Sequence, residues 1–185
     1  MKLRALTAIA IGLSLAVFAS AGEVAGVKMP DTVMVEGKTL KLNGMGLRTK
    51  VVFKVYVLGL YLETPSKDAA AVISAEQVKS VRMSLLRDVA GAKITETIME
   101  GFERNSKSQM GALKARLDKL HAMVPDVVKG DQIVLTYVPG KGTVVTAKGI
   151  EKGVIEGKDF ADALFSVWLG LSPAQEDLKK ALLGA

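Results

Sequence analysis

The chain has 185 residues, of which 49% are hydrophobic and 24% are charged, and its formal net charge is +6 at pH 7. This composition is typical of a globular protein rather than a disordered one, and the length favours one domain. The sequence contains no cysteine, which excludes disulfides, thiolate nucleophiles, iron–sulfur clusters and zinc sites with sulfur ligands. Its one histidine, His121, excludes a two-histidine metal site within one chain. We therefore expect neither a metal nor a cofactor.

Residues 1–21 have the order of a secretory signal peptide. A short basic start precedes an apolar run over 5–18, and a small-x-small cleavage site follows at 19–21. The alternative, a buried N-terminal helix, leaves the basic start and the cleavage site unexplained. Cleavage after Ala21 would leave 22–185 as a single domain, and in a Gram-negative bacterium the product would be periplasmic.

The rest of the sequence gives little support for a membrane span or for nucleic acid. No later stretch reaches the ~20 apolar residues of a transmembrane helix, so stable membrane insertion is not expected. The positive charge is modest and spread along the chain, and aromatic residues make up only 5% of it, too few for a base-stacking platform.

The first half of the exported part is rich in β-sheet signals. Residues 32–35 and 39–42 read as two strands joined by a turn, and the two glycines within 43–46 indicate a bulge or a close backbone approach. Residues 47–63 carry the strongest β signal, with many β-branched and aromatic side chains. Because this run exceeds an ordinary strand, we expect a bend or a tight hairpin inside it.

The sequence then alternates between helical and β patterns. A short helix over 68–75, capped by Ser66, precedes a strand that begins at Val78. Two amphipathic stripes at helical spacing predict two helices with a break between them: Ile94, Ile98 and Phe102, then Met110, Leu113, Leu117, Leu120 and Val124.

The C-terminal part predicts a β-hairpin and two more helices. Two β-rich runs surround Pro139–Gly142, and the first helix after them ends at Gly170. Residues 172–175 form a capping box with proline at the first helical position, which predicts the start of the last helix. Sequential strands with short turns favour an α+β domain with a largely antiparallel sheet and helices on one face.

Residues typical of catalysis are few. His121 lies near the end of a helix and is more typical of a structural histidine, and no serine stands in a Gly-x-Ser-x-Gly turn. Arg48 and Tyr56 attract attention because they lie in the most apolar β region. Together they could bind a carboxylate, provided that the chain turns back near Thr49–Lys50. The alternative is an edge-strand arginine in water and a core tyrosine.

Four segments, in order, resemble the chalcone isomerase-like family. They are Asn43-Gly44-Met45-Gly46-Leu47-Arg48, the strand Lys54–Glu63, the helix start Lys93-Ile94-Thr95-Glu96, and Glu156–Gly170 with the following Ser172-Pro173. The resemblance covers nearly the whole exported chain. It implies an open-faced β-sandwich, in which an antiparallel sheet carries helices on one face and a ligand cleft lies between them.

The resemblance favours the fatty-acid-binding branch of this family over the plant enzyme. Arg48 matches an arginine of the cleft, and Tyr56 matches a tyrosine of the fatty-acid-binding members where the enzyme has a threonine. Ala90 takes the place of the catalytic tyrosine, Thr97 that of an asparagine, and Ala161 that of a serine or threonine.

These residues predict a non-catalytic binding protein for a small apolar carboxylate such as a fatty acid. Arg48, Tyr56 and Thr97 are the predicted ligand-binding residues, and the expected apolar support comes from Val52, Phe53, Phe102 and Trp168. Two alternatives stay open. One is an isomerase, an intramolecular lyase of chalcone isomerase type acting on another carbonyl substrate, and the other is an interaction module without a ligand.

Overall fold

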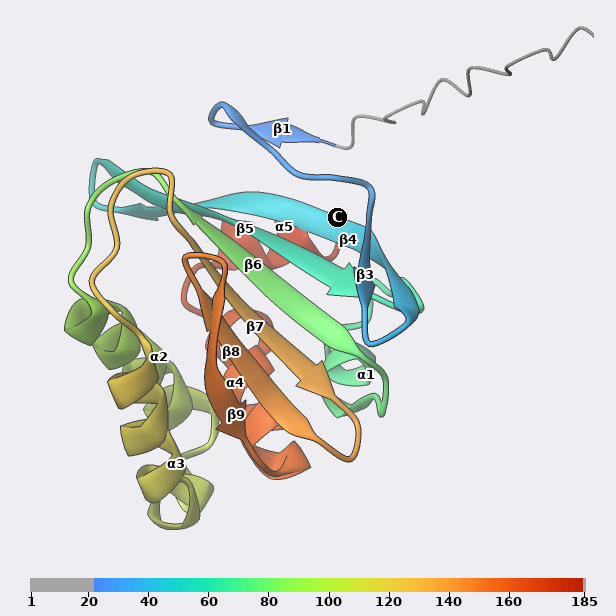
Figure 1. Cartoon of the computed structure of the whole chain (residues 1–185), viewed down its shortest axis with the longest axis vertical. Helices are drawn as coiled ribbons and strands as arrows, with labels where there is room; N and C mark the ends of the chain where they lie inside the picture. Colours follow the sequence, from blue (N-terminus) through green and yellow to red (C-terminus); the bar gives the residue numbers. More distant parts are fainter. Residues whose placement is uncertain (1–21, 185) are drawn as a thin grey trace, which may run out of the picture.

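An antiparallel sheet of seven strands forms the centre of the molecule in the computed structural model, which describes residues 22–184 (Figure 1). Each strand pairs with its neighbours in sequence, in the order β3 (Thr32–Val35), β4 (Lys38–Lys50), β5 (Phe53–Leu62), β6 (Lys79–Leu85), β7 (Gln132–Val138), β8 (Gly142–Ala147) and β9 (Ile150–Ile155). A separate small hairpin, β1 (Glu23–Val24) and β2 (Val27–Lys28), precedes them. The predicted signal peptide lies outside the described residues.

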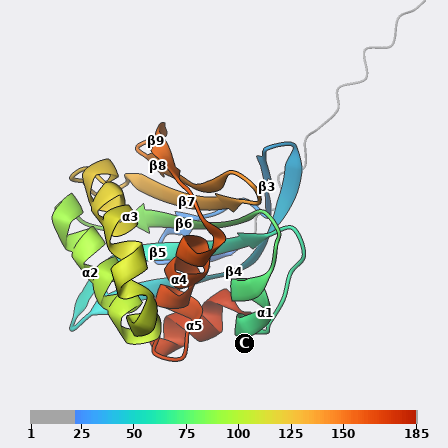
Figure 2. The same cartoon turned by 90° about the horizontal axis from the view of Figure 1, so that it is seen from below.

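The helices lie on one face of this sheet (Figure 2), which confirms the predicted α+β class. They are α1 (Ala69–Ser74), α2 (Gly91–Asn105), α3 (Met110–Met123), α4 (Lys158–Leu169) and α5 (Glu176–Leu182), with a short 3-10 turn at Lys107–Gln109. Helix α4 packs against α2 and the sheet, and α5 lies along β4. Within residues 22–184 no helix is long and apolar enough to cross a membrane.

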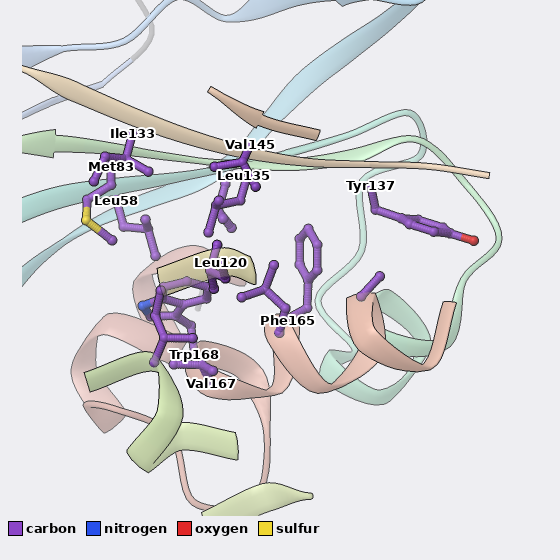
Figure 3. Packing of buried hydrophobic residues seen from close by; sticks show 14 of the residues in the cluster. Leu58, Met83, Leu120, Ile133, Leu135, Tyr137, Val145, Phe165, Val167 and Trp168 are labelled. Atoms are coloured by element: carbon purple, nitrogen blue, oxygen red, sulfur yellow. The ribbon is translucent and has the colours of Figure 1, made fainter. Parts of the chain in front are cut away.

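The alternation of side chains along β5 separates two apolar clusters. Tyr56, Leu58 and Leu60 point toward the helices and join the main core, whereas Val57 and Tyr61 face the opposite side of the sheet. Figure 3 shows the main core, in which side chains of the sheet meet α3 and α4: Leu58, Leu135 and Val145 from the sheet, Leu120 from α3, and Phe165, Val167 and Trp168 from α4.

The long β signal over 47–63 contains the predicted tight hairpin. Strand β4 ends at Lys50 and β5 begins at Phe53, so only two residues form the turn. Because of this turn, Arg48 and Tyr56 are direct cross-strand partners instead of lying about 26 Å apart, as they would on one straight strand.

Both predicted roles of the glycine segment are present. The pairing of β4 with β5 shifts register between Leu42 and Gly44, which marks a bulge. The segment also approaches α5 closely: a Cβ on Gly46 would lie 2.8 Å from Ala181 Cβ, and one on Gly44 would overlap the carbonyl oxygens of Ala181 and Leu182. The glycines therefore make room for the last helix.

Two predicted helix caps are wrong. Asp68, not Ser66, caps α1, because its carboxylate accepts hydrogen bonds from the second and third residues after it. The capping box at 172–175 also fails, since α5 begins only at Glu176 and the Gln175 side chain makes no cap bond. That side chain instead reaches β4, which brings it into the site described next.

Candidate ligand-binding cavity

A cavity of about 390 Å³ lies between the sheet and the helices, beside the turn that joins β4 to β5. Strands β4, β5 and β6 and helices α2 and α4 contribute to its wall. Much of the wall is apolar, formed by Val55, Met83, Ile94, Ile98, Val167 and Trp168. An apolar concave space of this size, with a few polar groups to fix orientation, is typical of small-molecule sites.

Tyr56 brings a hydroxyl group to the apolar wall. The residue is only 6% exposed, and Trp168 Nε1 donates a hydrogen bond of 3.0 Å to its hydroxyl oxygen. An indole N–H can only donate, so the tyrosine oxygen is the acceptor. Within residues 22–184 the Tyr56 hydroxyl has no acceptor for its own proton, so this proton is available to a molecule in the cavity.

The surroundings keep this hydroxyl protonated. Burial raises the pKa of Tyr56 above its ordinary value of 10.0, and the hydrogen bond from Trp168 and the positive charge of Arg48 oppose that rise. At neutral pH the group is therefore a neutral donor rather than a phenolate. It can donate to a carboxylate without adding negative charge to the site.

Arg48 lies opposite Tyr56 on β4 and also lines the cavity. Its Nη1 donates to the carbonyl oxygen of Thr49 at 2.9 Å and to Gln175 Oε1 at 3.2 Å. Both acceptors are neutral, and in the described part of the chain Arg48 has no salt bridge to a carboxylate. Its positive charge is therefore left for a ligand.

Gln175 holds the Arg48 segment in place. Besides accepting from Arg48, its Oε1 accepts from the backbone N–H of Thr49 at 3.0 Å, and its Nε2 donates to the carbonyl oxygen of Leu47 at 3.2 Å. One side chain thus binds three consecutive residues of β4. Sequence reasoning missed this role because the pattern at 172–175 matches a helix cap.

The exposed charged residues that line the cavity form its mouth, and most of them are positive. Lys50, Arg87 and Lys93 line it together with one carboxylate, Asp88. Lys93 forms an ion pair with Glu96 on α2, and the Arg87 guanidinium lies over the Phe53 ring at 4.8 Å from its centre. An anion entering the cavity therefore meets a favourable field.

Of the other residues that the family resemblance singles out, Thr97 and Ala90 line the cavity and Ala161 does not. Thr97 lines the cavity, but its hydroxyl donates to the carbonyl oxygen of Lys93 at 3.0 Å, which leaves only its acceptor capacity and its methyl group for a ligand. Ala90 lines the cavity just before α2, whereas Ala161 is fully buried in α4 and does not line it.

Of the four residues expected to give apolar support, Phe53 and Trp168 line the cavity. Val52 and Phe102 do not. Val52 is 80% exposed in the turn, and Phe102 is fully buried in the core, where it packs against Phe160.

Residues 22–184 hold no group of three acidic or histidine side chains that could bind a metal ion. His121 belongs to α3, and its Nδ1 lies 2.7 Å from Oγ1 of Thr95 in α2. Neither residue is among those that line the cavity.

The sheet, the helices on one of its faces and the cavity between them define an α+β protein with a cavity between sheet and helices. The chain belongs to the chalcone isomerase-like family, whose model matches residues 21–184. Among solved structures it is similar to a fatty-acid binding protein of Arabidopsis thaliana, with a TM-score of 0.71, 15% identity, and coverage of 89% of this chain and 95% of the plant chain. A search of curated proteins finds no match.

Proposed function

We propose that this protein binds a small apolar carboxylate, such as a fatty acid, in the cavity between the sheet and the helices. The observation that carries the proposal is the cross-strand pair of Arg48 and Tyr56 in an otherwise largely apolar cavity. The pair offers a cation without a carboxylate partner in the described chain, next to a hydroxyl proton without an acceptor there.

The apolar tail of such a ligand suits the apolar wall of the cavity, and its carboxylate suits the pair of Arg48 and Tyr56. Each CH₂ group of the tail that leaves water contributes about 0.8 kcal/mol. The carboxylate would be expensive to bury alone, but a guanidinium and a hydroxyl can satisfy it with charge-assisted hydrogen bonds. Support also comes from the similar plant structure, which is described as a fatty-acid binding protein.

Calorimetry with palmitate and the delipidated protein tests this proposal. Hydrogen bonds to charged groups contribute about 1.5–3 kcal/mol, so Arg48→Ala should weaken binding by roughly 10- to 150-fold. Lys50→Ala should have a much smaller effect, because Lys50 is exposed at the mouth. Lys41→Ala is the matched control, since Lys41 is an exposed cation on the same strand, distant from the cavity residues.

Two results would contradict the proposal: no palmitate binding by the unmodified protein, or undiminished binding by Arg48→Ala. Mass spectrometry of gently purified protein adds an independent readout, because a tightly held carboxylic acid should travel with the protein. A protein that carries and binds no such molecule would favour an interaction module.

We further propose that the protein is exported to the periplasm and that the mature chain begins at Gly22. The basic start, the apolar run and the small-x-small site support this. N-terminal sequencing of protein from a periplasmic extract should begin at Gly22. An intact Met1 on protein in the cytoplasm would contradict it.

A further inference from the structure

The turn between β4 and β5 presents apolar side chains to solvent. Val51, Val52 and Phe53 are 90%, 80% and 57% exposed. In Figures 1 and 2 this turn lies at the edge of the molecule. None of the three side chains belongs to the buried core, so burial within this chain does not account for them.

Valine at position 51 does not suit the backbone conformation of the turn. Val51 has a backbone φ of +56°, a left-handed conformation that suits glycine, asparagine or aspartate and is unusual for a β-branched side chain. A residue chosen for the turn alone would be small or polar. The apolar tip therefore calls for a contact outside the chain.

Exposed cations surround the apolar tip. Lys50 and Lys54 flank it in sequence, and the Arg87 guanidinium stacks on Phe53. Within the described residues none of these three cations forms a salt bridge. Exposed apolar side chains next to several cations favour binding to the interface of a membrane that contains anionic lipids.

The tip and the cavity mouth share residues. Lys50, Phe53 and Arg87 line the cavity, whereas Val51 and Val52 do not line it and are largely exposed. We propose that the β4–β5 tip docks on an anionic lipid surface, with Val51 and Val52 inserted among the headgroups. The cavity mouth would then face the membrane, and an apolar carboxylate could pass between bilayer and cavity. This passage rests on the proposed function, but docking does not.

The positive charge beside the tip favours a lipid surface over a second copy of the chain as the partner. Two tips brought together would place their unpaired cations against one another, which opposes association. An anionic headgroup layer neutralises those cations and also receives the apolar side chains. The proposal therefore commits to a lipid surface as the partner.

Vesicle co-sedimentation of the delipidated protein tests docking. Vesicles of phosphatidylcholine and phosphatidylglycerol at 7:3 should bind the protein at least tenfold more strongly than pure phosphatidylcholine. The double variant Val51→Asn with Val52→Ser suits the turn and removes the two most exposed apolar side chains of the tip, and it should lower binding about tenfold. Met34→Ser is the matched control: Met34 is 67% exposed and lies on β3, paired with Thr39 near the start of β4 and away from the β4–β5 turn, so binding should not change.

A second variant tests the electrostatic part. Lys50→Glu with Lys54→Glu should abolish the preference for phosphatidylglycerol, and added salt should weaken binding of the unmodified protein. Absence of vesicle binding, or equal binding by the tip variant and the unmodified protein, would overturn the proposal. A dimer in analytical ultracentrifugation that the tip variant loses would also overturn it, in favour of self-association.

The two proposals fail separately. The tip variant leaves every cavity-lining residue in place, so it should bind palmitate in solution as well as the unmodified protein does. Loss of vesicle binding with intact palmitate binding supports docking, whereas vesicle binding without palmitate binding contradicts only the cavity proposal.

Discussion

Replacing Gly44 by alanine should destabilise the protein, because this glycine makes room for α5. An added Cβ would overlap the backbone carbonyl oxygens of Ala181 and Leu182. These atoms belong to the last turn of a helix, and the Asn43 side chain also donates to the Leu182 carbonyl at 2.8 Å. Neither oxygen can move by a rotamer change, so the helix and the strand must separate.

The expected cost lies at the upper end of ordinary overpacking, about 2–3 kcal/mol. For a chain of this length, each kcal/mol lowers Tm by about 2–4 °C, so the expected loss is about 4–12 °C. Thermal unfolding followed by circular dichroism measures it. Gly111→Ala in α3 is the matched control, since nothing lies within 4 Å of its added Cβ. That variant should gain up to about 1 kcal/mol from better helix propensity.

A Gly44→Ala variant that melts at or above the unmodified protein would refute this reasoning. It would mean that α5 does not approach β4 as closely as the structure has it. A parallel loss in Gly111→Ala would point instead to a general sensitivity of the chain to alanine.

Three further predictions concern charge and chemistry. Burial lowers the pKa of Lys79 from 10.5 to about 8, so between pH 8 and 10.5 the unfolded chain holds more protons than the folded one and stability rises with pH. Across that window the free energy of unfolding in urea should rise by on the order of 1–3 kcal/mol more for the unmodified protein than for Lys79→Met. A difference between the two proteins that stays constant with pH would contradict the shift. Gln175→Glu should weaken palmitate binding in calorimetry more than Gln175→Ala, because a carboxylate there would pair with Arg48 and compete with the ligand; equal affinities would argue against this pairing. Chalcone mixed with the protein should cyclise no faster than spontaneously, because Ala90, at the position where the resemblance places the catalytic tyrosine of the plant enzyme, has no hydroxyl group. Appreciable turnover would favour an isomerase.

Local patterns predicted most of the fold. Period-two alternation and β-branched residues located β3 to β8, and the length of the 47–63 run predicted its hairpin. The hairpin of β1 and β2 and the last strand, β9, were not predicted. The β4–β5 hairpin explains how Arg48 and Tyr56 meet, since a turn of two residues makes them cross-strand partners. Both inferences need only information within about twenty residues of sequence.

The remaining features depend on contacts between distant segments. Gln175 reaches Arg48 across 127 residues, and nothing in its own neighbourhood distinguishes it from a helix-capping residue. Phe102 and Val52 were expected at the ligand because they are apolar. Apolarity alone, however, does not separate a core side chain from one at a cavity or at an exposed turn.

The direction of the hydrogen bond at the Tyr56 hydroxyl shows how a contact with a distant residue determines what the candidate site can bind. A tyrosine hydroxyl can donate or accept, and its own strand does not decide between the two. Trp168, 112 residues further along the chain, supplies a group that can only donate, so the oxygen must accept and the proton must point elsewhere. Arg48 on the neighbouring strand leaves no acceptor on that side, because a guanidinium has none. With both neighbours acting as donors, the site as a whole is complementary to an acceptor that carries negative charge.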